Sequence, residues 1–268
     1  EAAARWQPAP RYVVLAGSGH FDYRDLLGNG GNWVPPLLTG SRHGLFAADG
    51  RFADLTGDDW VPEVAIGRIP ARTAAELSAY VAKLAAYEAG LGDASGRALL
   101  VADNAEPGLD FAAGLEELTE SLPTDFEQGW VELVPGQVDS ARAALFSGLA
   151  SGANLLAYSG HGGIDRLAAE GLLTLADLPS LPAAGELPVM VALTCVLNRF
   201  ELPYVEPLGA RLVMEPESGA VAVWSASGLS SHPWVEGLGR LFFEELRKSP
   251  GARLGDLMRE AQGRFAFR

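Results

Sequence analysis

The chain has 268 residues, a formal net charge of −14, and 48% hydrophobic against 20% charged residues. This composition supplies a full hydrophobic core and excludes disordered, collagen-like and disulfide-rich scaffolds. The acidic surplus would repel phosphate backbones and anionic lipids, so it argues against nucleic-acid binding and against binding to a membrane surface.

Predicted strands and helices alternate along the chain. The strand-like runs are Tyr12–Ala16, Glu63–Ile66, Ala98–Ala102, Trp130–Val134, Asn154–Tyr158, Pro188–Leu193 and Gly219–Trp224. The helical stretches are Thr73–Glu88, Phe111–Ser121, Ser140–Leu149, Tyr204–Met214, Trp234–Lys248 and Ala252–Phe265. Several runs are apolar throughout, which is typical of strands buried on both faces. The alternation predicts an α/β fold with a mostly parallel sheet, and a site beyond the carboxyl ends of its strands.

Two long segments separate these elements. The glycine-rich segment Gly17–Asp59 has little periodicity and is predicted to be irregular, and Gly162–Leu187 is predicted to hold at most a short helix. A glycine-containing stretch, Gly90–Gly96, is the only plausible internal linker. We therefore divide the chain into an N-terminal subdomain, residues 1–92, and a second subdomain, residues 93–268.

Two of the predicted strands end in reactive side chains, His161 and Cys195. If the strands are parallel neighbours, the two side chains emerge side by side, and the imidazole can take the thiol proton so that the thiolate attacks a carbonyl. Gly160 and Gly162 flank the histidine, and the amides of Gly162 and Cys195 are placed to stabilise an oxyanion. A free cysteine alone is most often a small buried hydrophobe, but the pair at two strand ends favours catalysis.

Other catalytic motifs are missing from the sequence. No Gly-x-Ser-x-Gly nucleophile elbow occurs, which argues against a serine esterase. The stretch Gly28-Asn-Gly-Gly does not complete a dinucleotide-binding motif, because Trp33 stands where the last glycine belongs.

Three segments of the sequence resemble the catalytic domain of gingipain-type cysteine peptidases, which have a caspase-like α/β fold. They are Tyr12-Val-Val-Leu-Ala-Gly with Asp58 to Glu76, Tyr158-Ser-Gly-His-Gly-Gly163, and Ala192-Leu-Thr-Cys195 followed by Gly219 to Gly228. The resemblance implies that Cys195 is the nucleophile, that His161 is the general base, and that the amides of Gly162 and Cys195 form the oxyanion hole. It also implies a carboxylate near the histidine, for which Asp103 and Glu106 both fit and Glu106 is the closer match. The alternative is that these carboxylates belong to an ordinary acidic loop at a helix start.

The resemblance also suggests where substrate binds. The family builds a pocket wall from the segment after the last strand, here Ser225 to Trp234, so Ser227 and Trp234 are candidate substrate-binding residues. Trp234 equally suits a helix start packed on the core. Asp110 lies near the position of the acidic residue that selects a basic side chain in gingipains, so it is the third candidate.

An acidic run from Asp54 to Glu63 offers oxygen ligands at the short spacing that calcium accepts. Gingipain-like domains bind structural calcium, so Asp54, Asp58 and Glu63 are the candidate ligands, although the run lacks the helix–loop–helix pattern. Zinc is not expected, because the four histidines are scattered and there is one cysteine. The chemistry itself requires no cofactor.

These observations predict a secreted or cell-envelope cysteine endopeptidase that acts on protein or peptide substrates. A transpeptidase that uses the same site and a non-catalytic caspase-like scaffold are the alternatives. The chain departs from the family in three places. Its start and its end are short, which predicts an excised domain or completion by flanking domains of a longer precursor. Val196-Leu-Asn-Arg-Phe replaces a glycine-containing turn after the cysteine.

Overall fold

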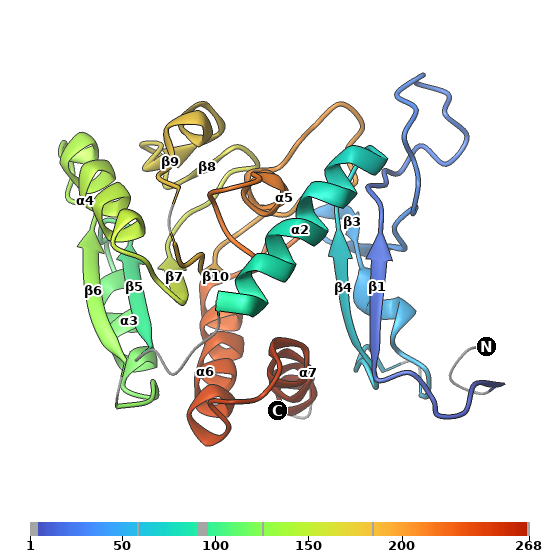
Figure 1. Ribbon diagram of the computed structural model, residues 1–268. Helices are drawn as coiled ribbons and strands as arrows, with labels where there is room; N and C mark the ends of the chain where they lie inside the picture. The colour runs from blue at the N-terminus through green and yellow to red at the C-terminus, as the bar shows by residue number, and fades with distance from the viewer. Residues whose placement is uncertain (1–4, 58, 91–95, 125, 184, 267–268) are drawn as a thin grey trace.

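The computed structural model describes residues 5–57, 59–90, 96–124, 126–183 and 185–266. Its centre is a five-stranded sheet in which every neighbouring pair of strands is parallel (Figure 1). In spatial order the strands are β11 (Ala222–Ser225), β10 (Val189–Leu193), β7 (Leu155–Ser159), β5 (Arg97–Ala102) and β6 (Glu127–Glu132). This confirms the predicted α/β fold. The three inner strands are almost wholly buried, as their continuous apolar runs predicted.

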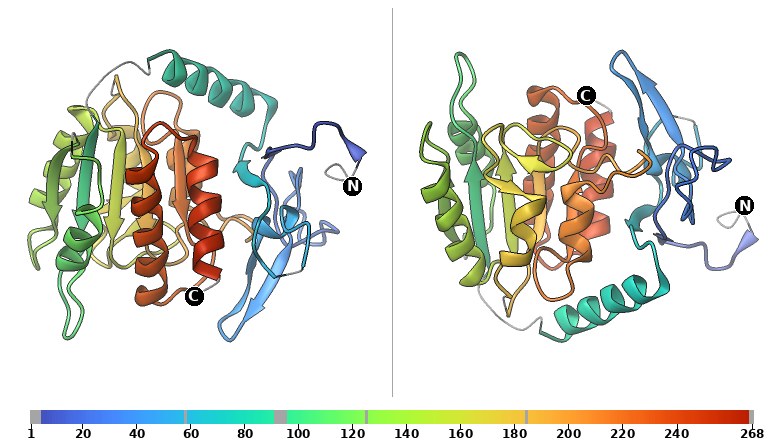
Figure 2. Two further views of the ribbon diagram at one scale, coloured as in Figure 1. Left: turned by 90° about the horizontal axis from the view of Figure 1, so that it is seen from below. Right: turned by 90° about the horizontal axis from the view of Figure 1, so that it is seen from above.

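Helices cover both faces of this sheet (Figure 2). One face packs on α3 (Phe111–Thr119), α6 (His232–Lys248) and α7 (Leu254–Ala266), and the other on α4 (Val138–Ala150) and α5 (Leu208–Met214). Alternate residues of β5 point to opposite faces, so Leu100 belongs to the first core and Leu99 to the second. α5 begins later than predicted, because Pro207 lies immediately before it with extended backbone.

The N-terminal part of the chain forms a separate parallel pair of strands, β1 (Tyr12–Ala16) and β4 (Ala65–Ile69). α7 packs against β4, and the Tyr12 hydroxyl donates to Asp256 at 2.7 Å. The glycine-rich segment is more ordered than predicted, since it holds the hairpin β2 (Leu38–Ser41) and β3 (Gly44–Ala47) and the 3-10 helix η1 (Asp49–Phe52). A strand of four residues is too short to show a clear hydrophobic periodicity, so the sequence does not reveal these strands.

α2 (Ala74–Gly90) runs between the two sheets along the outside of the molecule (Figures 1 and 2). The Thr73 hydroxyl caps its start by accepting the amide of Glu76 at 3.1 Å, while the Glu76 carboxylate accepts the amide of Arg72 at 2.6 Å. The buried Lys83 ammonium donates to carbonyl groups between α5 and β11, among them those of Glu215 at 2.7 Å and Ala220 at 2.9 Å. Most of the linker Gly90–Gly96 lies outside the described residues.

The segment between β7 and β10 also contains more structure than expected. It holds the strand pair β8 (Arg166–Leu167) and β9 (Leu173–Thr174) and the 3-10 helix η2 (Leu175–Ser180). Within the described ranges, no helix is both long and apolar enough to span a bilayer.

Candidate active site

His161 and Cys195 leave the same edge of the sheet. β7 and β10 are parallel neighbours in which Ser159 pairs with Leu193, and each candidate residue stands two positions beyond that pair. This confirms the predicted neighbourhood of the two strands. The segments that follow are in close contact, since a Cβ placed on Gly162 would lie 2.4 Å from Thr194 Oγ1 and 2.9 Å from the Cys195 carbonyl oxygen.

A buried carboxylate holds the backbone of the histidine. Asp103 is 2% exposed, and its Oδ2 accepts the His161 amide at 2.9 Å. Burial raises the pKa of Asp103, while the hydrogen bonds from the His161 and Asn104 amides act in the opposite direction. The Tyr158 hydroxyl donates to the His161 carbonyl at 2.6 Å, so the backbone is fixed on both sides. Gly160 is required here, because a Cβ would lie 2.3 Å from that of Asp103.

A second carboxylate contacts the imidazole ring itself. Glu106 Oε1 lies 3.1 Å from His161 Nε2. Glu106 is held in a tight turn, in which its amide donates to the Leu109 carbonyl at 2.8 Å and the return bond is 3.0 Å. The edge of the Phe111 ring packs near the imidazole, with centroids 5.4 Å apart. Since Nε2 faces the carboxylate, Nδ1 is the nitrogen left to exchange a proton with thiol or substrate.

The two predicted oxyanion donors are open. Among the described residues, no protein acceptor engages the amides of Gly162 or Cys195. Both amides are therefore available to a ligand at the edge where the two strands end.

The thiol is held by Ser230, a residue that the sequence did not single out. Cys195 Sγ donates to the Ser230 carbonyl at 3.1 Å and accepts the Ser230 amide at 3.4 Å. No hydrogen bond joins Sγ to the His161 ring within the described part of the chain. At rest the thiol therefore points to the segment that follows β11.

The residue after the cysteine adopts an unfavourable backbone conformation. Val196 has a φ of +46°, a left-handed value that β-branched residues rarely adopt and that costs about 1–3 kcal/mol. The Val196 amide donates to the Gly228 carbonyl at 3.1 Å, which ties this turn to the segment after β11. The sequence showed that the glycine-containing turn is replaced here, and valine occupies a left-handed position that suits glycine.

The three candidate substrate-binding residues all make contacts within the protein. Asp110 caps α3 by accepting the Ala113 amide at 3.0 Å, and the Ser227 hydroxyl donates to the Ala47 carbonyl at 2.7 Å. Trp234 packs edge-on against Phe265 with ring centroids 5.6 Å apart, yet it stays 67% exposed. Trp234 therefore keeps most of its surface open to a substrate.

His232, at the start of α6, also packs against the ring of Phe111. Its ring centroid is 5.0 Å from that of Phe111. Burial lowers the pKa of His232, and His161 acts in the same direction, whereas Glu236 at 3.6 Å opposes them. No pattern in the sequence predicts this contact, because it joins two elements far apart in the chain.

The acidic loop expected to bind calcium satisfies its carboxylates internally. Glu63 Oε2 accepts the Leu55 amide at 2.6 Å, Oε1 accepts the Thr56 hydroxyl, and Asp54 Oδ2 accepts the Trp60 amide at 3.0 Å. The described residues contain no group of three metal-ligating side chains, although Asp54 Oδ1 is buried without a partner. Asp58 lies outside the described residues. Among the described residues, the side chains of this loop therefore do not form a calcium cage by themselves.

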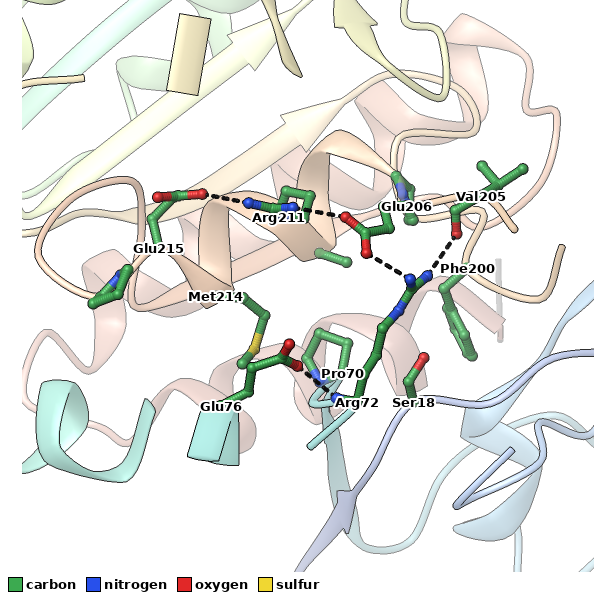
Figure 3. Close-up of a pocket in the computed structure, with 13 residues that line it drawn as sticks. Ser18, Pro70, Arg72, Glu76, Phe200, Val205, Glu206, Arg211, Met214 and Glu215 are labelled. Carbon is green, nitrogen blue, oxygen red and sulfur yellow. Dashed lines mark hydrogen bonds and ion pairs between the residues drawn. The ribbon is translucent and has the colours of Figure 1, made fainter. Parts of the chain in front are cut away.

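A pocket of about 180 Å³ lies between the N-terminal part and α5 (Figure 3). The Arg72 guanidinium binds Glu206 at 2.5 Å, and Arg211 binds both Glu206 at 2.7 Å and Glu215 at 2.9 Å. None of the predicted site residues lines this pocket. The charged side chains of this pocket pair with one another, and these ion pairs join the N-terminal part to α5.

A second cavity, of about 310 Å³, adjoins the segment that follows Cys195. It is lined by the apolar side chains of Phe21, Leu38, Leu45 and Leu202, together with Arg199 and Glu201. The hairpin β2–β3, which the sequence did not predict, therefore contributes a wall beside the segment that follows Cys195.

The comparisons with known proteins agree with this fold. The model of peptidase family C25 matches residues 1–267. The fold is similar to that of the Arg-specific cysteine proteinase gingipain R (RgpB), with a TM-score of 0.72 and 15% identity over 98% of this chain and 60% of that chain. A complex of the pro- and mature domains of Porphyromonas gingivalis RgpB gives a TM-score of 0.72 and 16% identity over 98% of this chain and 62% of that chain.

A further solved protease gives a TM-score of 0.69 and 18% identity over 96% of this chain and 59% of that chain. No curated protein matches the chain in sequence. The chain spans about three-fifths of the length of these structures, and the likeness confirms the caspase-like fold. The chain belongs to peptidase family C25, the family of the gingipains.

Proposed function

We propose that this chain is a cysteine endopeptidase in which Cys195 is the nucleophile and His161 the general base. One observation carries the proposal: the in-register ends of β7 and β10 bring an imidazole and a thiol to one edge of the sheet. Membership of peptidase family C25 supports the reaction class. The open amides of Gly162 and Cys195 supply the donors that a tetrahedral oxyanion needs.

The mechanism proceeds through a thioester. The S–H of Cys195 turns from the Ser230 carbonyl toward His161 and gives its proton to the imidazole, and the sulfur attacks the scissile carbonyl carbon. Glu106 at Nε2 orients the ring and stabilises the imidazolium, which then protonates the leaving amine. Water hydrolyses the thioester, with the imidazole acting again as base.

The substrate in this proposal is a protein or peptide. Asp110 would favour a basic side chain before the cut bond, and Ser227 and Trp234 would form part of the wall. The relatedness to gingipains also supports two further proposals: flanking domains of a longer precursor as partners, and an extracellular or cell-envelope location. The complex of RgpB pro- and mature domains is the relative that bears on the first of these.

A fluorogenic peptide library varied at the residue before the cut tests the function. We expect cleavage by the wild-type chain and none by Cys195→Ala or His161→Ala, and the preferred residue identifies the pocket. An added amine that appears in the product mass would reveal a transpeptidase. Cleavage that survives in Cys195→Ala would refute the proposal.

A melting-temperature measurement tests structural calcium at Asp54, Asp58 and Glu63. A calcium site there predicts a higher melting temperature with calcium than with a chelator, and Glu63→Gln would remove the difference. Equal melting temperatures in both conditions would contradict a calcium site.

A further inference from the structure

Ser230 touches the sulfur with three of its polar groups. Its carbonyl lies 3.1 Å from Cys195 Sγ, its amide 3.4 Å and its hydroxyl 3.5 Å. The carbonyl can only accept, so it favours the protonated thiol. The amide and the hydroxyl can donate, so they favour the thiolate.

The Ser230 hydroxyl has a choice of acceptor. Oγ lies 3.3 Å from the Thr194 carbonyl oxygen and 3.5 Å from Cys195 Sγ. A hydroxyl carries one proton, so it can donate to only one of these acceptors at a time. While the thiol is protonated, the Thr194 carbonyl is the stronger acceptor. Once the sulfur carries a negative charge, a charge-assisted hydrogen bond to it is favoured.

We propose that Ser230 is a catalytic residue whose hydroxyl turns from the Thr194 carbonyl to Cys195 Sγ and stabilises the thiolate, together with its own amide. The inference rests on the proposed function, in which Cys195 is the nucleophile. The Sγ–H bond breaks and its proton goes to the His161 imidazole, after which the S–C bond to the substrate carbonyl forms. The Ser230 hydroxyl keeps its proton throughout, so no other reactant is needed.

Two backbone hydrogen bonds fix the segment that leads to Ser230. The Gly228 carbonyl accepts the Val196 amide at 3.1 Å, and the Ala226 carbonyl accepts the Asn198 amide at 3.2 Å. These bonds tie the segment after β11 to the segment after Cys195, so the backbones of the two segments are held against each other. Ser231, the next residue, is exposed and its side chain makes no capping bond to α6, which makes it a matched control.

The test is the pH dependence of alkylation by iodoacetamide, followed by intact mass. The chain has one cysteine, so each adduct reports on Cys195 alone. In Ser230→Ala we expect the midpoint of the alkylation curve to rise by about 0.5–1 pH unit, because a hydrogen bond to the charged sulfur is lost. Below the midpoint, alkylation should slow about three- to tenfold.

Two further variants separate a chemical role from a structural one. Ser230→Thr keeps the hydroxyl and should restore the midpoint to within about 0.2 pH unit of the wild-type value, while Ser231→Ala should leave it unchanged. A midpoint in Ser230→Ala that coincides with the wild-type one would overturn the inference. If the midpoints coincide but peptide cleavage is lost in Cys195→Ala, the proposed function still holds. If peptide cleavage survives in Cys195→Ala, the proposed function is refuted whatever the alkylation midpoint.

Discussion

Replacing Gly162 by alanine tests whether the close packing of the histidine segment on the cysteine segment controls catalysis. The new Cβ would lie 2.4 Å from Thr194 Oγ1 and 2.9 Å from the Cys195 carbonyl oxygen, distances that real Cβ atoms do not adopt. Thr194 is 2% exposed and β-branched, and the carbonyl is backbone, so neither can swing away. The two segments must therefore separate by roughly half an ångström or more.

This separation would displace the amide of Gly162 and change the distance between His161 and Cys195. Since a misplacement of about 1 Å can cost about a hundredfold in rate, we expect kcat/KM to fall about ten- to a hundredfold in Gly162→Ala. That loss corresponds to about 1.4–2.7 kcal/mol of transition-state stabilisation. The assay is kcat/KM on the best fluorogenic peptide, together with the melting temperature of each variant.

Gly163→Ala is the matched control. Its Cβ would first meet Arg166 Cγ at 3.2 Å and Asp165 Oδ1 at 3.3 Å, which belong to exposed, flexible side chains. We expect Gly163→Ala to keep kcat/KM within about twofold of the wild-type value, because those side chains can move aside. Full activity in Gly162→Ala, or an equal loss in both variants, would refute the reasoning.

Three further predictions concern single side chains. Glu106→Gln should lower kcat about ten- to a hundredfold with little change in KM, because it leaves His161 without a carboxylate to stabilise its charged form. Burial lowers the pKa of His232 below 6.5, so the unfolded chain binds a proton at this residue more readily than the folded chain does. The free energy of unfolding, measured with urea, should therefore fall as the pH drops below 6.5. His232→Gln should remove that part of the pH dependence. Burial lowers the pKa of Lys83 to about 8, so the ammonium form still predominates at pH 7. Lys83→Met should lower the free energy of unfolding at pH 7 by about 2–4 kcal/mol, because the buried carbonyl groups lose their donor. A loss below about 0.5 kcal/mol would contradict this.

The parallel sheet and the position of the site follow directly from the sequence. The apolar runs that end in His161 and Cys195 are strands β7 and β10, and their pairing puts both residues at one edge. Such buried runs can be recognised in the sequence because nearly every residue in them is apolar. Asp103 and Glu106 were both candidates for the carboxylate near the histidine, and they contact different parts of it, the amide and the ring.

Other parts of the site could not be predicted, because they depend on contacts between distant segments. Ser230 lies 35 positions after Cys195 and reaches its sulfur only through the pairing of β10 with β11. Phe111 and His232 meet only because α3 and α6 pack on the same face of the sheet. The hairpin β2–β3 was missed for a different reason, since its strands have four residues each and are largely exposed.

Labelling by a peptidyl acyloxymethyl ketone is the most direct test of the central claim that Cys195 is an activated nucleophile. This reagent needs a bound peptide and a thiolate, so it separates a working site from a merely accessible cysteine. We expect a single adduct on Cys195 in the wild-type chain, formed at least about a hundredfold faster than in His161→Ala. Equal labelling rates in the two proteins, or no adduct in either, would contradict the account.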